Sequence, residues 1–402
     1  MEQRPSLRGS AGRPKHAAKK NGFLLLWLLP LLAVLIAALW FFLFSGKEEQ
    51  KAPAASGVSS GALSSAPSKP EPSPPSSAPV SSEPKKEAEP TPLPEQKPPT
   101  GDPEQLGALL KIGDTGYEYY NFVTDFANEY ISTVARAQEQ LGDRTLYDLV
   151  IPTSMGVMLP ESYIEQHGIN SSDQRKAIEE YLYPSIGGLA PRVKTVSLFD
   201  PLRAHAGEYI YFRTDHHWTQ LGAYYAYVEF CGAKGIAPVP LAQFDKKEYS
   251  GFLGSFYSDA PNEAMENHPD IVEAYLPRAE ISLSYTTVDG ETCSQALIED
   301  GSEYASELLY LIFAAGDQPY EEIVNHDLAD GPSCVVVKES FGNALVPFLA
   351  NHYRRMIVVD YRYYEGSIAE LAAETGAQDV IFLNNISMTR NEELVNDLSN
   401  LF

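Results

Sequence analysis

Four residues that could do chemistry stand side by side in YFRTDHHWTQLGAYYAYVEF, residues 211–230, just before a predicted helix: Asp215, His216, His217 and Trp218. In an extended segment, residues two apart point the same way, so we expect Asp215 and His217 to share one face and His216 and Trp218 the other. A carboxylate that orients an imidazole makes that ring a base for a hydroxyl nucleophile. The pattern therefore predicts part of a nucleophilic site whose nucleophile lies elsewhere in the chain.

Ser340 is the best candidate for that nucleophile. The run VVV at 335–337 predicts a buried strand, and Phe341 and Gly342 open a predicted helix. Ser340 would then lie at the carboxyl end of a parallel strand, where α/β sheets place their sites. The helix start offers backbone N–H groups of Ser340 and Gly342 to a developing oxyanion. A serine at a helix start is commonly only a cap, and the upstream Asp-x-His pair favours the catalytic interpretation.

Two alternatives share the same residues. Histidine and aspartate both bind zinc or manganese, but adjacent His216 and His217 are expected to face opposite ways, and no second ligand cluster is evident. Intracellular DHH phosphoesterases share the letters, yet the predicted export and the absence of a nearby DxD run count against them. We therefore predict no metal and no cofactor. His216 is then a packing or substrate-binding residue, and Trp218 is either a core residue or a substrate-binding surface on which a sugar ring stacks.

The amino-terminal segments predict a membrane anchor. Residues 23–44, FLLLWLLPLLAVLIAALWFFLF, carry no charge and are long enough to cross a bilayer core of roughly 30 Å. The bulky end WFFLFSG offers no small-x-small cleavage site, so the anchor is expected to stay uncleaved. Residues 1–22 form a basic tail, which is expected to stay in the cytoplasm. The rest of the chain should then lie outside the membrane.

The remaining chain divides into a linker and one large domain. Residues 45–103 are rich in Pro and Ser with few apolar residues to bury, so we predict a disordered linker. Residues 104–402 suffice for one large extracytoplasmic domain. The formal net charge of the chain is −24. Nucleic acid is therefore a poor partner, because binding phosphates needs clustered Lys and Arg, and a neutral or cationic glycan fits better.

Predicted helices and apolar strands alternate along this domain, which implies an α/β fold with a mostly parallel sheet. Residues from about 242 to 322 are β-rich with hairpin-like turns, and we predict an insertion that covers one end of the core. Three cysteines are too few for a disulfide scaffold. Cys334 is expected to be a buried thiol, and a bridge between Cys231 and Cys293 stays open.

Three ordered motifs, RTDHHWTQLGAYYAY, KESFGNALVPFLANHY and VVDYRYY, resemble the DHHW family of bacterial envelope proteins. This family is related to the alginate O-acetyltransferase proteins. The resemblance implies a three-layer SGNH-hydrolase-like fold, with Asp215 orienting His217 and His217 activating Ser340. It also implies a polysaccharide acceptor and a separate multi-pass membrane acyltransferase that supplies acetyl groups. Arg362 matches an arginine near the site in related proteins, so it is either a substrate contact or part of a structural salt bridge.

Two residues depart from the pattern of that family. Glu339 stands where an aspartate commonly precedes the serine, and Asp317 stands where an asparagine is common. An ionised carboxylate only accepts hydrogen bonds, so Asp317 would not replace an asparagine that donates to an oxyanion. The first hypothesis is a membrane-anchored serine O-acetyltransferase or acetylesterase that acts on an envelope or exported polysaccharide. The second, favoured by Glu339 and Asp317, is a glycan-binding or assembly protein that has lost the chemistry.

Overall fold

The computed structural model describes residues 98–402. The predicted anchor at 23–44 and most of the predicted linker lie outside the described residues. From residue 98 onward, no helix is both long and apolar enough to cross a membrane.

An eight-stranded sheet forms the centre of the fold. Its strands, in spatial order, are β5 (Lys194–Thr195), β4 (Thr145–Ile151), β13 (Asp379–Asn385), β11 (Ser333–Lys338), β12 (Arg355–Asp360), β10 (Tyr320–Asn325), β8 (Ile281–Thr286) and β9 (Thr292–Gln295). The first five strands run parallel, and the last three join them antiparallel. The predicted mixed α/β fold with a large, mostly parallel sheet is confirmed.

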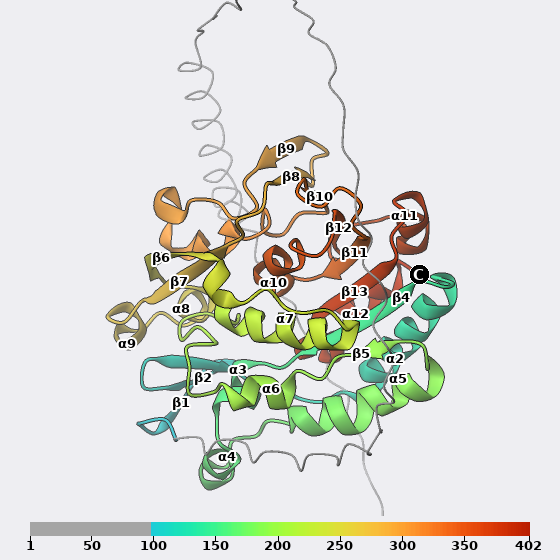
Figure 1. The fold of residues 1–402 in the computed structure, drawn as a ribbon. Helices are drawn as coiled ribbons and strands as arrows, with labels where there is room; N and C mark the ends of the chain where they lie inside the picture. The colour runs from blue at the N-terminus through green and yellow to red at the C-terminus, as the bar shows by residue number, and fades with distance from the viewer. Residues whose placement is uncertain (1–97) are drawn as a thin grey trace, which may run out of the picture. The chain divides into compact units, whose positions relative to one another are not determined.

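Helices cover both faces of this sheet, because its central strands are apolar on both sides. Val336 and Ile381 pack on one face and Val335 and Val380 on the other. The first face carries α3 (Ser154–Met158), α6 (Phe199–Ala204), α7 (Gln220–Lys234) and α10 (Gly342–Leu349). The second face carries α2 (Thr124–Gln140), the π-helical η1 (Lys176–Leu182), α5 (Tyr183–Leu189), α11 (Ile368–Glu374) and α12 (Glu392–Ser399). Figure 1 shows α7 and α10 side by side.

The β-rich region at about 242–322 contributes to the central sheet as well as to a separate hairpin. It contains η2 (Leu241–Gln243), β6 (Asp245–Phe252), α8 (Ser255–Asp259), α9 (Glu263–Glu266), β7 (Asp270–Leu276), β8, β9, η3 (Gly301–Glu303) and η4 (Ser306–Ile312). Within residues 98–402, strands β6 and β7 pair only with each other, whereas β8 pairs with β10 and extends the central sheet. The region therefore extends the core instead of only covering one end of it.

A three-stranded meander precedes α2. It comprises β1 (Pro103–Leu106), β2 (Leu109–Ile112) and β3 (Thr115–Glu118), and it packs near α4 (Glu161–His167) and α8. The contact with α8 is tight, because a Cβ added at Gly116 would lie 2.7 Å from the Phe256 ring. The Gly116 N–H donates to the carbonyl of Arg213, at 2.8 Å. The meander is thereby fixed beside the segment that carries Asp215.

All three cysteines are free thiols, so the bridge between Cys231 and Cys293 does not form. Cys334 is buried on the face of β11 that packs under α7, as expected of its apolar strand.

Candidate active site

Ser340 lies in the short turn between β11 and α10. The turn is closed by the Gly342 N–H, which donates to the Glu339 carbonyl at 2.9 Å. The expectation that this N–H stabilises an oxyanion is therefore wrong, because it already has an acceptor. A glycine is needed at position 342 because there is no room for a side chain: an added Cβ would lie 2.6 Å from the Cβ of Lys338.

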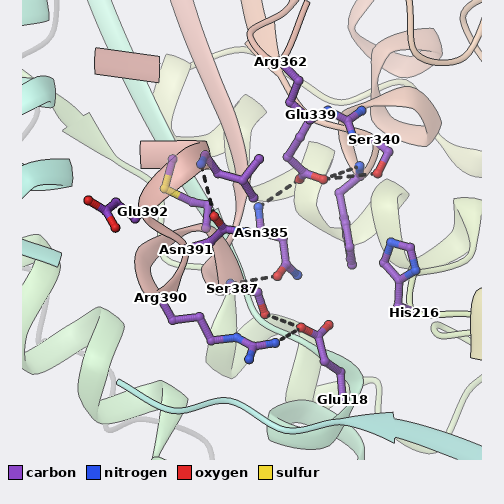
Figure 2. Close-up of a pocket in the computed structure, with 13 residues that line it drawn as sticks. Glu118, His216, Glu339, Ser340, Arg362, Asn385, Ser387, Arg390, Asn391 and Glu392 are labelled. Carbon is purple, nitrogen blue, oxygen red and sulfur yellow. Dashed lines mark hydrogen bonds and ion pairs between the residues drawn. The ribbon is translucent and has the colours of Figure 1, made fainter. Parts of the chain in front are cut away.

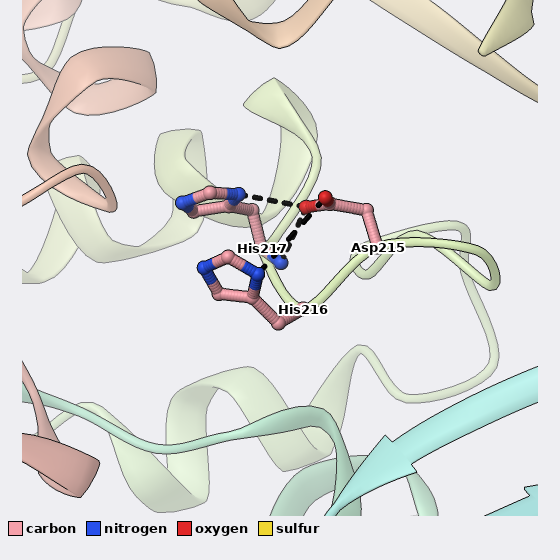
Figure 3. Close-up of side chains that lie close together, drawn as sticks. All are labelled: Asp215, His216 and His217. Carbon is pink, nitrogen blue, oxygen red and sulfur yellow. Dashed lines mark hydrogen bonds and ion pairs between the residues drawn. The ribbon is translucent and has the colours of Figure 1, made fainter. Parts of the chain in front are cut away.

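Asp215, His216 and His217 lie in a run of bends before α7, not in an extended segment. The carboxylate of Asp215 folds back onto His217, and its Oδ1 accepts from the His217 N–H at 2.9 Å and from Nδ1 at 2.7 Å. The two imidazole rings lie next to each other, with centroids 3.8 Å apart (Figure 3). The expected separation of His216 and His217 onto opposite faces is therefore wrong.

The other nitrogen of His217 contacts the serine. His217 Nε2 lies 2.7 Å from Ser340 Oγ, so the structure joins Asp215, His217 and Ser340 in one chain of hydrogen bonds. The Tyr310 ring stacks on the His217 ring at 3.9 Å, and its hydroxyl donates to the Ser340 carbonyl at 3.0 Å. His217 and Ser340, which are 123 positions apart in the sequence, are thereby held in contact, in the geometry of a hydroxyl and its base.

Trp218 lies in the core beneath the chain Asp215–His217–Ser340 and not at its surface. Its side chain is fully buried, and its indole N–H donates to the Phe341 carbonyl at 2.9 Å. The assignment of Trp218 to substrate binding is therefore wrong, because no face of the ring is open to a sugar. Trp218 instead fixes the start of α7 against the turn that carries Ser340.

The pKa values of His217 and Asp215 suit the role of His217 as a base. Burial lowers the pKa of His217 to about 4, which leaves its ring neutral at neutral pH and able to accept the Ser340 proton. Burial alone would raise the pKa of Asp215, but the two neighbouring imidazoles and the Ser255 N–H outweigh it and hold that pKa well below its usual range. An ionised Asp215 then faces a neutral His217 that becomes positive when it takes a proton.

Asp215, His216 and His217 also bring possible metal-ligand atoms within 4.8 Å of one another. Hydrogen bonds account for this proximity. Asp215 Oδ2 accepts from the Ser255 N–H at 2.8 Å, and His216 Nδ1 lies 2.6 Å from Ser255 Oγ. Since both nitrogens of His217 contact Asp215 and Ser340, an ion at this place would have to break the chain of hydrogen bonds.

Ser340 opens into a cavity of about 510 Å³, which we call the serine pocket (Figure 2). Its other walls come from His216, Arg362, Asn385 and η5 (Ile386–Arg390). The His216 side chain is partly exposed, consistent with its predicted place at the substrate side.

A second cavity, of about 1110 Å³, adjoins the serine pocket along β1 and β2, and we call it the meander groove. The two cavities share Glu118, His216 and Arg390. Glu118 joins their walls, because its carboxylate accepts from Ser387 Oγ at 2.8 Å and pairs with Arg390. Together the two cavities form a long depression that ends at Ser340.

Arg362 is both a salt-bridge partner and a wall of the serine pocket. Its guanidinium makes two hydrogen bonds with Asp360, at 2.8 and 2.6 Å, and lies 3.0 Å from Asp317. Asp317 also accepts from Asn343 Nδ2 at 2.8 Å. Burial would raise the pKa of Asp317, but the charges of Lys338 and Arg362 lower it, so this residue is ionised and donates no hydrogen bond.

Glu339 is buried next to the serine. Its Oε2 accepts from the Phe341 N–H at 3.1 Å and lies 3.3 Å from Ser340 Oγ, and its Oε1 accepts from the Asn385 N–H at 2.9 Å. Burial raises the pKa of Glu339. Glu339 thus links the turn at Ser340 to the end of β13.

Several residues at this site lay outside the sequence-based predictions: Gly254, Ser255, Asp270, Tyr310 and Asn385. Asp270 is fully buried, and its Oδ2 accepts from the backbone N–H groups of Arg213 and Thr214 at 2.9 and 2.7 Å. No local pattern marks Gly254, Ser255, Asp270 or Tyr310. Asn385 did carry a signal, since it ends DVIFLNN, a predicted parallel strand whose carboxyl end is where sites form.

Comparisons with known proteins agree with this architecture. The family model of the DHHW protein matches residues 87–359. A DHHW family protein from Eubacterium siraeum is similar in structure, with a TM-score of 0.66 and 28% identity over 75% of this chain and 98% of that chain.

Bacillus cereus PatB1 is also similar, and its structure has been solved with a sulfonyl adduct. The TM-score is 0.57 with 17% identity, over 71% of this chain and 97% of that chain, a likeness that shows the fold. No curated protein matches this sequence.

Proposed function

The chain belongs to the DHHW family, and on that premise we propose that it is an acyltransferase or esterase that works through an ester on Ser340. One observation carries the proposal, namely the two consecutive 2.7 Å contacts from Asp215 Oδ1 to His217 Nδ1 and from His217 Nε2 to Ser340 Oγ. A neutral buried imidazole between an ionised carboxylate and a hydroxyl is the arrangement that activates a serine.

The reaction follows from these contacts in two halves. In the first, Ser340 Oγ attacks the carbonyl carbon of an acyl ester, and its proton moves to His217 Nε2. The tetrahedral intermediate then expels the alcohol, which takes that proton, and the acyl group stays on Ser340. In the second, water or a sugar hydroxyl gives its proton to His217 and attacks the serine ester. The bond to Ser340 Oγ then breaks, His217 returns the proton to Ser340 Oγ, and the acid or the acylated sugar is released. Asp215 stabilises the imidazolium in both halves.

We propose a polysaccharide as the acceptor. The meander groove leads away from Ser340 and is large enough for several sugar units, and the chain as a whole is acidic, which suits a neutral or cationic glycan. In this proposal the domain has the three-layer SGNH-hydrolase-like architecture and is held outside the cell membrane by the predicted anchor. A separate multi-pass membrane acyltransferase supplies the acetyl group.

The second candidate is a glycan-binding or assembly protein without turnover. The ionised Asp317 favours it, since a negative charge near His217 opposes the negative charge that develops on the oxygen of the tetrahedral intermediate. Under this alternative the cavities bind sugar and Ser340 forms no ester.

Acylation of Ser340 separates the two candidates. The full chain is incubated with p-nitrophenyl acetate, and both p-nitrophenolate release and intact mass are followed for wild type, Ser340→Ala and Ser387→Ala. The proposal expects one added acetyl group, or turnover, in wild type and in Ser387→Ala but not in Ser340→Ala. Equal glycan binding by wild type and Ser340→Ala, with no acylation in either, would favour the second candidate. Phenylmethylsulfonyl fluoride is a second probe, because a sulfonyl group that reacts with an activated serine should mark Ser340 alone.

A further inference from the structure

A further cavity, of about 920 Å³, adjoins the serine pocket, and we call it the tyrosine cleft. It lies between the turn that joins β8 to β9, the loop after β12 and the end of α12. Its aromatic wall consists of Tyr320, Tyr361, Tyr363 and Tyr364. Arg362 lines both the cleft and the serine pocket, and Figure 2 shows Arg362 and Glu118 at opposite ends of that pocket. Because Glu118 also lines the meander groove, the tyrosine cleft extends the depression at Ser340 at the end away from that groove.

The loop after β12 fixes the aromatic wall. The N–H groups of Tyr363 and Tyr364 both donate to the Asp360 carbonyl at 3.0 Å, which closes the turn. The Arg362 guanidinium is bound to the Asp360 carboxylate and lies 5.4 Å from the centre of the Tyr363 ring, a cation–π contact. Tyr363 nevertheless stays 45% exposed. A fixed and exposed aromatic ring offers an apolar surface on which the C–H groups of a sugar ring can pack.

Tyr361 lines the same cleft with a hydroxyl that has no partner. Its side chain is only 2% exposed, and within residues 98–402 the hydroxyl makes no hydrogen bond. Burial and then the charges of Glu339 and Asp360 raise the pKa of Tyr361 well above its usual value, so the hydroxyl keeps its proton and can donate. Since buried polar groups in proteins are nearly always paired, an unpaired hydroxyl on a cavity wall indicates a ligand that accepts from it.

Two carboxylates give the cleft a negative charge. Glu365 is exposed and Asp397 is half-buried, and within the described part of the chain neither carboxylate makes an ion pair or a hydrogen bond. Among the described residues that line the cleft, Arg362 is the only cation, and its guanidinium is already bound by Asp360 and Asp317. Unmatched carboxylates in a cleft attract cations. The ligand that fits these walls therefore carries a positive group.

We propose that the tyrosine cleft binds an amino sugar of the polysaccharide acceptor. The sugar face packs on Tyr363, its ammonium group lies near Glu365 and Asp397, and one of its oxygens accepts from the Tyr361 hydroxyl. A sugar with a free amine combines the C–H face, the acceptor oxygen and the positive charge that these walls match. We favour it over a lysine-rich peptide because the cleft continues into the serine pocket. The inference rests on the proposed function, since it names the class of polysaccharide that reaches Ser340.

Binding of a short chitosan oligosaccharide, a chain of glucosamine units, tests this site in the full chain. Calorimetric titration at about pH 6 keeps the Asp and Glu side chains ionised and the sugar amines protonated. The chitin oligosaccharide of the same length is the comparison, because its amines are acetylated and carry no charge. We expect chitosan to bind several-fold more tightly than chitin, and added salt should reduce the difference because it screens exposed charges.

Variants of Tyr363 and Tyr361 test the contacts of the sugar ring. Tyr363→Ala should weaken chitosan binding by about 3–10-fold, whereas Tyr363→Phe keeps the ring and should bind as wild type does. Tyr361→Phe removes only the unpaired hydroxyl, and it should weaken binding of both oligosaccharides by about 3–10-fold. The Tm of the free Tyr361→Phe protein should not decrease, because that hydroxyl has no partner within residues 98–402.

Glu365→Gln tests the recognition of charge, and Asp143→Asn is its matched control. Glu365→Gln should weaken chitosan binding by about 2–5-fold and leave chitin binding unchanged, because it removes a negative charge and keeps the size of the side chain. Asp143 is also exposed, lies in a turn outside the cleft, and has no ion pair or hydrogen bond to another described residue through its carboxylate. Its replacement changes the net charge equally and should leave chitosan binding at the wild-type level.

Three outcomes would overturn the inference. If wild type binds chitosan no more tightly than chitin, the cleft does not recognise an amine. If chitosan is preferred but Tyr363→Ala and Glu365→Gln bind it as wild type does, the sugar lies elsewhere. If a short lysine peptide binds as tightly as chitosan and is lost in the same variants, the cleft is a peptide site.

Failure of the proposed function gives a different result. If wild type forms no ester on Ser340 while the cleft variants still lose chitosan, the amino-sugar site stands and belongs to a protein that only binds glycan. If Ser340 is acylated while no cleft variant changes chitosan binding, the proposed function stands and this inference alone fails.

Discussion

Replacing Gly254 by alanine should disable the catalytic group without touching any of its three members. Gly254 lies between β6 and α8 with a φ of −87°, a value that alanine adopts freely. An added Cβ, however, would lie 2.3 Å from both the Cβ and Oδ2 of Asp215. The N–H of the next residue, Ser255, donates to the same Oδ2 at 2.8 Å, which holds the backbone at Gly254 close to the Asp215 side chain.

The size of the effect follows from this distance. Real Cβ contacts are essentially never under 3.0 Å, so the two residues must separate by at least 0.7 Å. Asp215 then moves relative to His217, to which it is bound at 2.7 Å. A misplacement of about 1 Å at a reacting centre can cost about 10²-fold in rate, and we expect a loss of that order in kcat/KM for p-nitrophenyl acetate.

A pH profile distinguishes displaced Asp215 from a general loss of folded protein. The charge of Asp215 raises the pKa of His217 against the effect of burial, so moving it away should shift the acid limb of kcat/KM to lower pH. A smaller amount of folded enzyme would lower the whole profile without moving the limb. Gly207→Ala is the control, since nothing lies within 4 Å of a Cβ added there. Wild-type kcat/KM with an unshifted limb in Gly254→Ala would refute this account of how Asp215 is oriented.

Four further predictions concern charge. Because the base works in its neutral form and the pKa of His217 is about 4, kcat/KM should stay level down to about pH 5 and fall below it, whereas a limb near pH 6.5 would contradict the burial argument. The unfolded chain takes up this proton near pH 6.5 and the folded chain only near 4, so the Tm should also decrease as the pH falls through that interval. Asp317→Asn should raise kcat several-fold by removing a negative charge near the reacting carbonyl, and an unchanged or lower kcat would speak against that placement. Lys338→Met should destabilise the protein by about 3–5 kcal/mol in urea unfolding, because Lys338 is fully buried, lies 3.4 Å from Asp360 and donates to the Gly316 carbonyl at 3.0 Å; an unchanged midpoint would be inconsistent with that network.

The sequence predicted those parts of the site that local patterns determine. Ser340 was found because an apolar strand followed by a helix start is a local signal, and the end of a parallel strand is a place where sites form. The alternation of apolar strands and helices is also a local signal, and it predicted the mostly parallel sheet. The contact between Asp215 and His217 was predicted, but the position of His216 beside His217 was predicted wrongly. The bends of residues 213–217 depend on Asp270, which is far away in sequence and accepts from the backbone N–H groups of Arg213 and Thr214. Gly342 was misassigned because the closure of a turn by its N–H is not visible in residue types.

The two departures from the family pattern were the reason to consider a protein without chemistry, and their surroundings weaken that reason. The charge of Asp317 is met by Arg362 and Asn343, and the carboxyl of Glu339 accepts from two backbone N–H groups. Glu339 Oε2 lies 3.3 Å from Ser340 Oγ, farther than His217 Nε2 at 2.7 Å, so His217 remains the nearer acceptor for the serine proton. A protein that only binds glycan needs no imidazole held against a hydroxyl, whereas His217 Nε2 lies 2.7 Å from Ser340 Oγ, the contact through which a base activates a serine. This contact therefore favours turnover over binding alone.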